Sequence, residues 1–318
     1  MAQTGRRDFG PETTTDEVLE GIDLSGRTAL VTGASGGLGA ETARALASRG
    51  ARVILAARDR EKLDAVAESI RRATAAEVET VALELGSLAG IRAAAGRVLE
   101  RHQALHVLVN NAGVMACPES RTEDGFELQF GVNHLGHFLL TGLLAPALLR
   151  GGSARIVCVS SRGHQQSPVR WDDLFFEKEP YDKWAAYGQS KTANVLHAVE
   201  LERRLGGRGV HAFAVHPGVI PTDLSRHMER EDFEHIRRRS GGQLRLKTVA
   251  QGAATSVYAA TAPELEGRGG VYLEDCHVAE VNDDPESREG VRSYALDPAA
   301  AARLWELSEE LVGQRLPV

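Results

Sequence analysis

The chain has 318 residues, of which 42% are apolar and 25% are charged, and its formal net charge at pH 7 is -7. This composition is that of a globular protein with a sizeable core, and the acidic balance argues against a general nucleic-acid binder or a binder of anionic membranes. The three cysteines, Cys117, Cys158 and Cys276, form no C-x-x-C pair, so neither a disulfide framework nor a thiolate metal site is indicated. A soluble protein in the reducing cytoplasm fits these features best.

Residues 1–24 are predicted to form an arm that packs on the main domain. They contain no apolar run long enough for a signal peptide or a membrane-spanning helix. Thr14 followed three residues later by Glu17 is a capping-box pattern, which predicts a short helix through Leu19. A disordered tail is the alternative for Met1–Pro11.

From Arg27 onward, short apolar runs alternate with helical patterns. Strands are predicted at Arg27–Thr32, Arg52–Ala57, Val78–Leu83, His106–Asn110, Ala154–Ser160, Val210–His216 and Gly270–Leu273. Helices are predicted at Glu41–Ser48, Arg60–Ala73, Leu88–Arg101, from about Gly125 to Leu149, around Tyr187–Leu205, at Thr248–Ala260 and at Asp297–Gly313. About seven strands alternating with helices predict a single α/β domain over 25–318, a doubly wound Rossmann-type parallel sheet with helices on both faces.

Two stretches interrupt this rhythm. Ser161–Trp184 is a polar, aromatic loop, and Pro221–Lys247 is a charged segment without a clear strand. Both follow the carboxyl ends of strands, where ligands bind in such sheets, so we expect a substrate cleft there with 221–247 as its lid. Surface insertions are the alternative. The basic residues of the lid, Arg226, Arg230 and Arg237–Arg239, are interpreted as a solvated helix face rather than as an anion site.

A glycine-rich turn joins the first predicted strand to the first helix. Glycines at 33, 37 and 39 let the backbone turn tightly and approach a pyrophosphate, and the following helix contributes free N–H groups and its positive dipole end. Because a strand precedes the turn and a helix follows it, the turn predicts a dinucleotide site, with Ser35 and Leu38 among the contacts.

The end of the second strand bears on the choice of cofactor. An NAD-preferring site places an acid here to hold the ribose hydroxyls, whereas this chain has Ala57 followed by Arg58. A guanidinium pairs well with a 2′-phosphate, so NADP(H) is predicted to be preferred over NAD(H). Asp59 is the rival if the register is shifted by one residue. Lys62 could add charge to the same pocket.

Tyr187 and Lys191 form a Tyr-x-x-x-Lys pattern on a predicted helix. Residues four apart lie on one helical face, so the phenol and the ammonium project into the same space. A free phenol is a poor base at neutral pH, but a nearby cation favours the phenolate and brings it towards its working range.

These motifs occur in an unbroken order from about Leu24 to Thr222: the glycine turn, Asn110–Gly113, Asn133, Ser161, Tyr187 with Lys191, and His216–Gly218. The ordered set resembles the short-chain dehydrogenase/reductase superfamily. Within it, the closest resemblance is to the retinol-dehydrogenase-like branch, relatives of which are the light-dependent protochlorophyllide reductases and the WW-domain oxidoreductases. The segments that carry this finer resemblance are Asn110–Pro118, Val132–Phe138, Ser160–His164 and the insertion before Tyr187.

The resemblance implies a catalytic set. Tyr187 would be the acid/base, and Lys191 would lower its pKa and hold the nicotinamide ribose. Ser161 would bind the substrate oxygen together with Tyr187, and Asn133 would bend its helix to hold a relay water.

It also implies a set of cofactor contacts. Asn111 would lie at the adenine ribose, and the 217–222 turn would meet the nicotinamide carboxamide and a phosphate. The acid usually found beside adenine is Glu84 here, one methylene longer. The remaining implied contacts are Leu85, Ala112, Gly113, Pro217, Gly218, Ile220 and Thr222.

The function implied is NAD(P)-dependent interconversion of an alcohol and a ketone or aldehyde on a lipophilic small molecule, by a homodimer or homotetramer whose long helices pair. A C=C reductase of the protochlorophyllide-reductase kind and a non-catalytic NADP(H)-binding protein are the alternatives. Some animal retinol dehydrogenases carry an apolar N-terminal anchor, whereas this N-terminus is polar, so no membrane attachment is expected.

Four histidines could take part in binding. His134 and His137 are three apart on a predicted helix, but no further ligands stand at metal-site spacing, so they are interpreted as packing or surface residues and no metal is expected. His164 and His216 follow strands beside the expected cleft. Substrate contact is predicted for His164, with a hydrogen-bonded loop histidine as the alternative reading of both.

Overall fold

The computed structural model describes residues 8–225, 228–239 and 245–318. Within them the centre of the fold is one sheet in the order β3-β2-β1-β4-β5-β6-β7-β8. The strands are β1 Thr28–Thr32, β2 Arg52–Ala57, β3 Val78–Ala82, β4 Val107–Asn110, β5 Ala154–Val159, β6 Val210–His216, β7 Val271–Glu274 and β8 His277–Val278. Neighbouring strands are parallel except for β7 and β8. The predicted doubly wound fold is confirmed.

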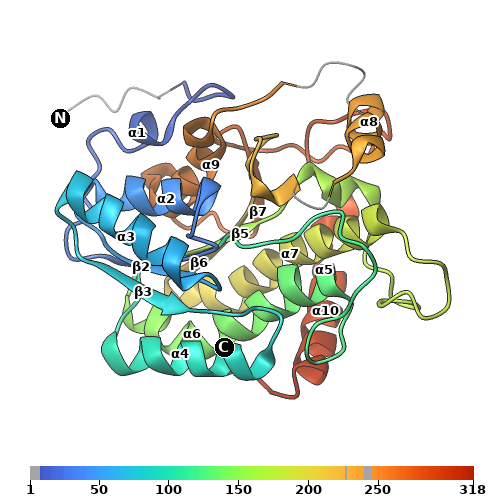
Figure 1. Ribbon diagram of the computed structural model, residues 1–318, viewed down its shortest axis with the longest axis horizontal. Helices are drawn as coiled ribbons and strands as arrows, with labels where there is room; N and C mark the ends of the chain where they lie inside the picture. Colours follow the sequence, from blue (N-terminus) through green and yellow to red (C-terminus); the bar gives the residue numbers. More distant parts are fainter. Residues whose placement is uncertain (1–7, 226–227, 240–244) are drawn as a thin grey trace.

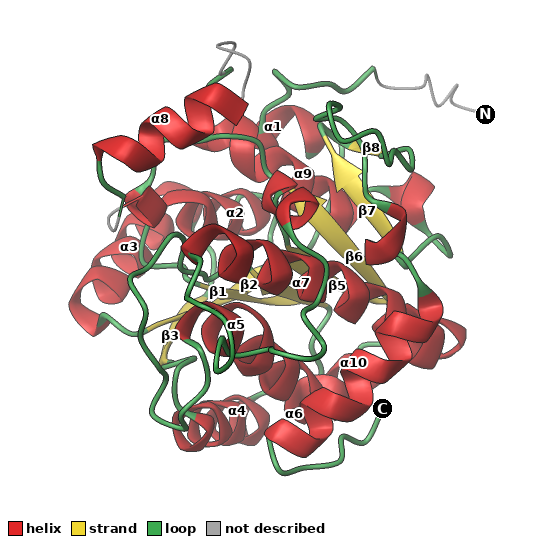
Figure 2. Ribbon diagram, turned by 90° about the vertical axis from the view of Figure 1, so that its right-hand side faces the viewer, coloured by secondary structure: helices red, strands yellow, loops and turns green. Residues whose placement is uncertain are grey.

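Helices cover both faces of the sheet. Their bounds are α1 Thr15–Val18, α2 Gly37–Ala47, α3 Arg60–Thr74, α4 Leu88–Arg101, α5 Leu128–Phe130, α6 Gly136–Arg150, α7 Lys183–Leu205, α8 Arg230–Arg239, α9 Val249–Thr261 and α10 Pro298–Leu311. On one face α4, α6, α7 and α10 share a core with residues such as Leu108 and Phe138. On the other, α1, α2, α3 and α9 enclose Val31 and Leu46. Figures 1 and 2 show the strands between these two helical layers.

The sheet and α2 differ from the sequence prediction, whereas a helix is present after Pro221, where a helix face was expected. The sheet gains an eighth strand, β8, which is antiparallel and only two residues long, too short for a recognisable pattern. Helix α2 begins at Gly37 rather than Glu41, because the glycine turn itself forms the first helical turn. The charged stretch after Pro221 contains a regular helix, α8, while its Arg226 lies outside the described residues.

The long helix predicted from about Gly125 is interrupted near its start. α5 passes into a π-helical turn, Gly131–Leu135, before α6 continues to Arg150. Among the described residues this 128–150 stretch is the one long and apolar enough to cross a membrane by length and composition. Its most apolar window is 78% buried inside the molecule, so it is the core helix beneath the sheet.

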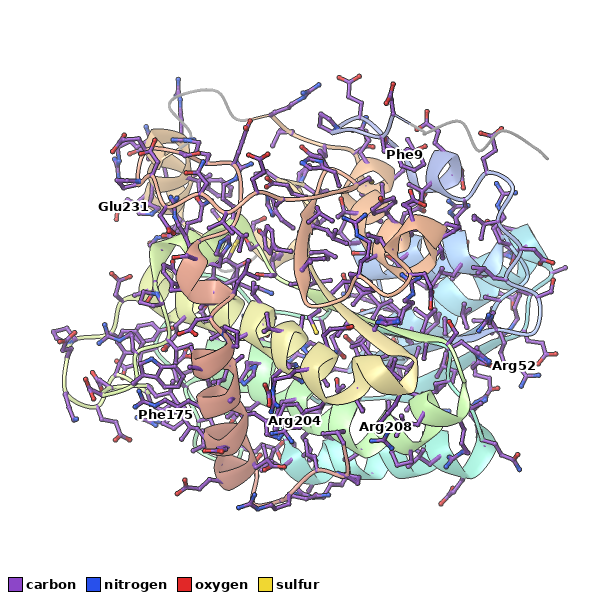
Figure 3. The ribbon with its side chains drawn as sticks, turned by 180° about the vertical axis from the view of Figure 1, so that it is seen from behind. Phe9, Arg52, Phe175, Arg204, Arg208 and Glu231 are labelled. Carbon is purple, nitrogen blue, oxygen red and sulfur yellow. The ribbon has the colours of Figure 1, made fainter. Side chains whose placement is uncertain are left out.

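The outer sides of α6 and α7 are covered by the end of the same chain. The Trp305 ring of α10 packs edge-on against Phe138 of α6 at 4.8 Å between centroids, and the guanidinium of Arg204 lies over it at 4.4 Å. Figure 3 shows Arg204 beside α10. Leu316 fills the space above Gly142, where an added Cβ would lie 2.2 Å from its side chain. The expected oligomer relied on free apolar faces of these helices, and those faces are not free.

The N-terminal arm packs on α2 and α9. The capping box is confirmed: Thr14 Oγ1 accepts from the Glu17 N–H, and the Glu17 carboxylate accepts from the Thr14 N–H at 2.7 Å. Phe9 packs edge-on against Tyr258 of α9. The alternative of a disordered tail concerns mainly residues 1–7, which lie outside the described part of the chain.

Candidate active site

A cleft of about 1420 Å³ opens at the carboxyl ends of the central strands, where the chain order reverses between β1 and β4. One end, which we call the glycine end, is lined by residues 33, 35–39, 56–59, 84–86 and 111–113. The opposite loop end is lined by residues 161–163, 165–166, 184, 224, 235–236, 238 and 285–288. Tyr187, Lys191 and residues 216–222 lie between the two ends.

All the cofactor residues expected from the sequence line this cleft. They are Gly33, Ser35, Gly37, Leu38, Gly39, Arg58, Glu84, Leu85, Asn111, Ala112, Gly113, Tyr187, Lys191, Pro217, Gly218, Ile220 and Thr222. They come from five separate turns, which the parallel sheet gathers at one edge, and from α7.

The glycine turn is packed so tightly that side chains are excluded. Gly33 has φ of 66°, in the left-handed region that favours glycine. A Cβ on Gly39 would lie 2.5 Å from the Gly33 carbonyl oxygen and 2.6 Å from Asn111 Nδ2. The free N–H groups at the start of α2 therefore reach the cleft without side chains in front of them, as a phosphate site requires.

Thr32 joins β1 to the turn after β4. Its Oγ1 accepts hydrogen bonds from the N–H groups of Asn111 (2.9 Å) and Ala112 (3.0 Å), and its carbonyl accepts from Asn111 Nδ2 at 2.8 Å. The amide of Asn111 is thus held in place at the switch point of the sheet, where the residue lines the cleft. The sequence prediction named Asn111 but not the threonine that fixes it.

The end of β2 separates the two candidates for cofactor discrimination. Arg58 is the first residue after the strand; its side chain is 63% exposed and lies 3.6 Å from the Glu84 carboxylate. Asp59 is the N-cap of α3, where its Oδ1 accepts from the Lys62 N–H at 3.1 Å. Because the Asp59 carboxylate is already used to cap the helix, the geometry favours Arg58 as the residue open to a ligand.

Tyr187 and Ser161 meet on the floor of the cleft. They lie close enough for Ser161 to act on the Tyr187 pKa, and an added Cβ on Gly163 would lie 2.6 Å from the Tyr187 ring and 3.4 Å from Ser161 Oγ, so glycine is needed there. Burial raises the pKa of Tyr187 to about 12, against the opposing effect of Ser161. Without a ligand the phenol is therefore protonated at neutral pH and ready to donate.

Lys191 lies one turn further along α7, below the phenol. Its Nζ donates to the Val159 carbonyl at 3.0 Å and is 5.6 Å from the centre of the Tyr187 ring. Burial lowers the pKa of this ammonium to about 8. The charge is thus held within Coulombic range of the phenol, and N–H groups other than the one bonded to Val159 remain for a ribose hydroxyl.

Asn133 lies under the cleft in the π-helical turn, as expected for a residue that bends its helix. Its Oδ1 accepts from the Val114 N–H at 2.8 Å and its Nδ2 donates to the Val114 carbonyl and to Ser190. The side chain is therefore fully used to hold the turn after β4. Its main-chain carbonyl accepts from His137 Nδ1 at 3.0 Å and keeps a second lone pair, which is open to a relay water.

Known proteins match this arrangement along the whole chain. The family model of the short chain dehydrogenases matches residues 27–173. Short-chain dehydrogenase/reductase prx1 of Penicillium roqueforti is 42% identical over 98% of this chain and 93% of its own length. Retinol dehydrogenase 11 of Homo sapiens is 43% identical over 93% and 88%. A crystal structure of an uncharacterized protein from Mycobacterium paratuberculosis covers 93% of this chain and 97% of its own, at 37% identity and a TM-score of 0.72.

The chain belongs to the short-chain dehydrogenase/reductase family. With relatives named retinol dehydrogenases, it is an oxidoreductase that acts on CH–OH or C=O groups, as the ordered motifs predicted. The family uses NAD(P). The glycine turn and the exposed Arg58 are the residues that would receive the phosphates of that group.

One predicted substrate contact of this short-chain dehydrogenase/reductase has to be corrected. His164 is fully buried beneath the cleft and does not line it. Its Nδ1 is bonded to the Ser161 carbonyl at 2.8 Å and its Nε2 accepts from the Arg292 N–H at 3.2 Å. Burial lowers its pKa to about 4, so the neutral ring is a structural link between Ser161 and the C-terminal region.

The other histidines also have structural contacts. His216 lines the cleft, and its Nδ1 accepts from the Arg162 N–H at 3.2 Å. His134 Nε2 bonds to Ser308 of α10, and His137 bonds to Thr32 on the opposite side of its helix. His134 and His137 are therefore packing residues, the first of the two readings made from the sequence.

Several residues of the loop end were missed from the sequence. Trp184 stacks on His235 of α8 at 4.7 Å, and Lys183 forms an ion pair with the buried Asp232 at 2.6 Å, so the two contacts fix α8 over the cleft. The 285–288 loop is held by Gln165, whose Nε2 donates to the Gly290 carbonyl at 3.2 Å. The loop positions after β5 and β6 were a signal for this end, whereas the 285–288 loop has no motif.

Proposed function

We propose that this protein is an NADP(H)-dependent oxidoreductase that interconverts an alcohol and a ketone or aldehyde on a lipophilic small molecule, with Tyr187 as the acid/base. The observation that carries the proposal is that Tyr187 and Ser161 meet on the cleft floor, with the buried Lys191 ammonium 5.6 Å from the centre of the Tyr187 ring.

Each catalytic side chain has a task in the reduction direction. Bound NADP(H) supplies the hydride. The Ser161 hydroxyl donates to the substrate carbonyl oxygen and orients it, and the protonated Tyr187 delivers a proton to that oxygen as charge develops there. The Lys191 ammonium stabilises the phenolate that is left, and the Asn133 carbonyl provides an acceptor for a water through which the phenol is reprotonated.

The residues present fit a dinucleotide with room to spare. Ligand pockets commonly measure about 300–1,000 Å³, and this cleft is larger, so it can hold a cofactor and a second molecule together. The glycine end has the backbone cradle, and Arg58 supports NADP(H) over NAD(H) because its guanidinium is a bidentate partner for a 2′-phosphate. The apolar side chains at and beside the loop end support a lipophilic substrate body: Val114, Met115, Leu128, Trp184, Leu224 and Ile236.

The protein is also proposed to act as a single copy. Burial of α6 and α7 by α10 supports this, since the helical faces through which the expected dimer would pair are already packed. Light scattering at micromolar concentration is expected to give the mass of one chain. A stable dimer would show that a different surface of the protein associates.

The test of the proposed function is a substrate panel with both cofactors. Purified protein is mixed with NADPH or NADH and a set of lipophilic ketones, aldehydes and α,β-unsaturated ketones, and cofactor oxidation is followed by fluorescence. Reduction of ketones or aldehydes with NADPH preferred is expected. Binding of NADPH without turnover of any compound would contradict the proposal in favour of a non-catalytic protein, and reduction confined to C=C bonds would contradict it in favour of a C=C reductase.

A further inference from the structure

The loop end of the cleft is basic, although the chain as a whole is acidic. Its lining contains three arginines, Arg162, Arg238 and Arg288, and a single carboxylate, Glu286. The other charged residues of the cleft lie elsewhere, at the glycine end or at Lys191. In a protein whose net charge is -7, this local excess of positive charge calls for a specific explanation.

Arg162 is the member of this group that is built into the wall. It follows Ser161 directly, begins the short 3-10 helix Arg162–Gln166, and its N–H is fixed to His216 Nδ1 at 3.2 Å. Its Nε is buried and has no hydrogen-bond partner, and within the described residues the guanidinium forms no ion pair. An unpaired guanidinium in a protein wall is costly unless a ligand supplies the acceptors.

The surroundings of Arg162 place its charge close to the catalytic floor. The guanidinium acts to lower the pKa values of His164, in the 3-10 helix after β5, of His216 at the end of β6 and of Glu274 at the end of β7. Glu274 is a carboxyl group on which the Arg162 charge acts, but its Oε1 accepts from the Gly290 N–H at 2.8 Å and burial raises its pKa. The Arg162 charge is therefore not neutralised by the wall behind it.

Arg238 and Arg288 differ from Arg162 in position. Arg238 is exposed on α8 at the rim, where solvent and salt screen it, while Arg288 belongs to the loop that Gln165 holds against the 3-10 helix. Both can attract an anion towards the cleft. Arg162 instead follows the serine that would hold the reacting oxygen, so it can bind an anionic group beside the reacting carbon.

We propose that the physiological substrate is amphipathic, an alcohol or carbonyl compound with an apolar body and one anionic oxygen group, and that Arg162 binds that group. The inference rests on the proposed function and adds a substrate class to it. A carboxylate and a phosphate each offer two oxygens that can accept from two N–H groups of one guanidinium. The test below separates the two groups.

The experiment compares compounds that differ only in charge. 3- and 4-Acetylbenzoate are paired with their methyl esters, and 4-acetylphenyl phosphate is set against its neutral dimethyl ester, with NADPH as reductant. For wild type, kcat/KM is expected to be about 10–100-fold higher for an anionic compound than for its ester, the range of a charge-assisted hydrogen-bonded pair. The anionic compound with the larger preference over its ester shows whether Arg162 binds a carboxylate or a phosphate.

Three variants test the role of Arg162. Arg162→Gln is expected to remove the anion preference while the esters are still reduced at nearly the wild-type rate. Arg230→Gln removes the same charge from α8 at a side chain that is 92% exposed and does not line the cleft, and the preference should be unchanged. Arg238→Gln should weaken the preference slightly and only at low salt.

The failures can be told apart. If wild type reduces esters and neutral ketones but shows no preference for either anion, the inference is wrong and the proposed function stands. If Arg162→Gln lowers anion and ester turnover equally, Arg162 has a structural role and the inference is also wrong. If no carbonyl compound is reduced with either cofactor, the proposed function fails as well. Titration calorimetry gives a readout without turnover. With NADP⁺ bound to both proteins, 4-acetylbenzoate should bind wild type more tightly than Arg162→Gln.

Discussion

At the glycine end of the cleft the wall is mostly backbone, whereas at the loop end it consists of side chains from segments far apart in the sequence. Gly33, Gly39 and the 111–113 turn are locked by main-chain contacts and by Thr32. The loop end depends on the 161–166 stretch, on α8 and on the 285–288 loop, held by an ion pair and a ring stack. A wall made of backbone cannot be altered much by side-chain substitution, whereas a wall made of side chains can. The glycine end is therefore suited to a ligand that stays the same, the cofactor, and the loop end to one that can differ, the substrate.

The largest effect is expected from a substitution on the floor of the cleft, between the two ends. Tyr187→Phe removes one hydroxyl and is expected to lower kcat by about 10²–10⁴, the usual value of general acid–base assistance. NADPH affinity should stay close to wild type, because the glycine end is untouched. Steady-state kinetics and a fluorescence titration measure the two effects. Near-normal turnover would mean that Tyr187 is not the acid/base.

The cofactor preference of the glycine end can be changed without altering the loop end. Ala57→Asp with Arg58→Ile exchanges a guanidinium for a carboxylate that accepts from ribose hydroxyls and repels a phosphate. Wild type should favour NADPH over NADH by about 10–100-fold in kcat/KM, and the double variant should favour NADH. A wild-type preference for NADH would show that Asp59, not Arg58, faces the ribose.

The pH dependence of reduction tests the floor electrostatics. Burial lowers the pKa of Lys191 from 10.5 to about 8, so the ammonium is charged below that pH and neutral above it, while Tyr187, with a pKa raised to about 12, stays protonated throughout. The kcat/KM of reduction should therefore be level below pH 8 and fall roughly tenfold per unit above it. Lys191→Arg keeps its charge, so its residual activity should show no such fall. A wild-type profile that stays flat well above pH 8 would contradict this account of Lys191.

The smallest expected effects are on the free energy of unfolding, and they have opposite signs for alanine substitutions at two glycines. Gly39→Ala forces a Cβ against the fixed Gly33 carbonyl and should cost about 1–3 kcal/mol of unfolding free energy and weaken NADPH binding. Gly96→Ala, within α4 and with open space around it, should instead raise the unfolding free energy by about 0.5–1 kcal/mol. Urea unfolding measures both. A tolerated Gly39→Ala would mean that the turn is not locked by its backbone.

The sequence was most informative where one residue type is required by local geometry. The glycine turn and the Tyr-Lys spacing could be predicted from the chain because they follow from backbone conformation and helical periodicity, whereas the role of Asn133 came from the family resemblance. His164 could not, since its two ring partners, the Ser161 carbonyl and the Arg292 N–H, are set by how the C-terminal region folds back. The covering of α6 and α7 by α10 also depends on tertiary packing, so it could not be predicted from the apolar pattern of these helices.

The most direct test of the central claim follows the hydride itself. NADPH labelled with deuterium at C4 of the nicotinamide is used to reduce an α,β-unsaturated ketone with the wild-type enzyme, and the product is examined by mass spectrometry and NMR. The account predicts an allylic alcohol with deuterium on the former carbonyl carbon, because Ser161 and Tyr187 hold the carbonyl oxygen. A saturated ketone with deuterium on the β-carbon would contradict it and would make the protein a C=C reductase.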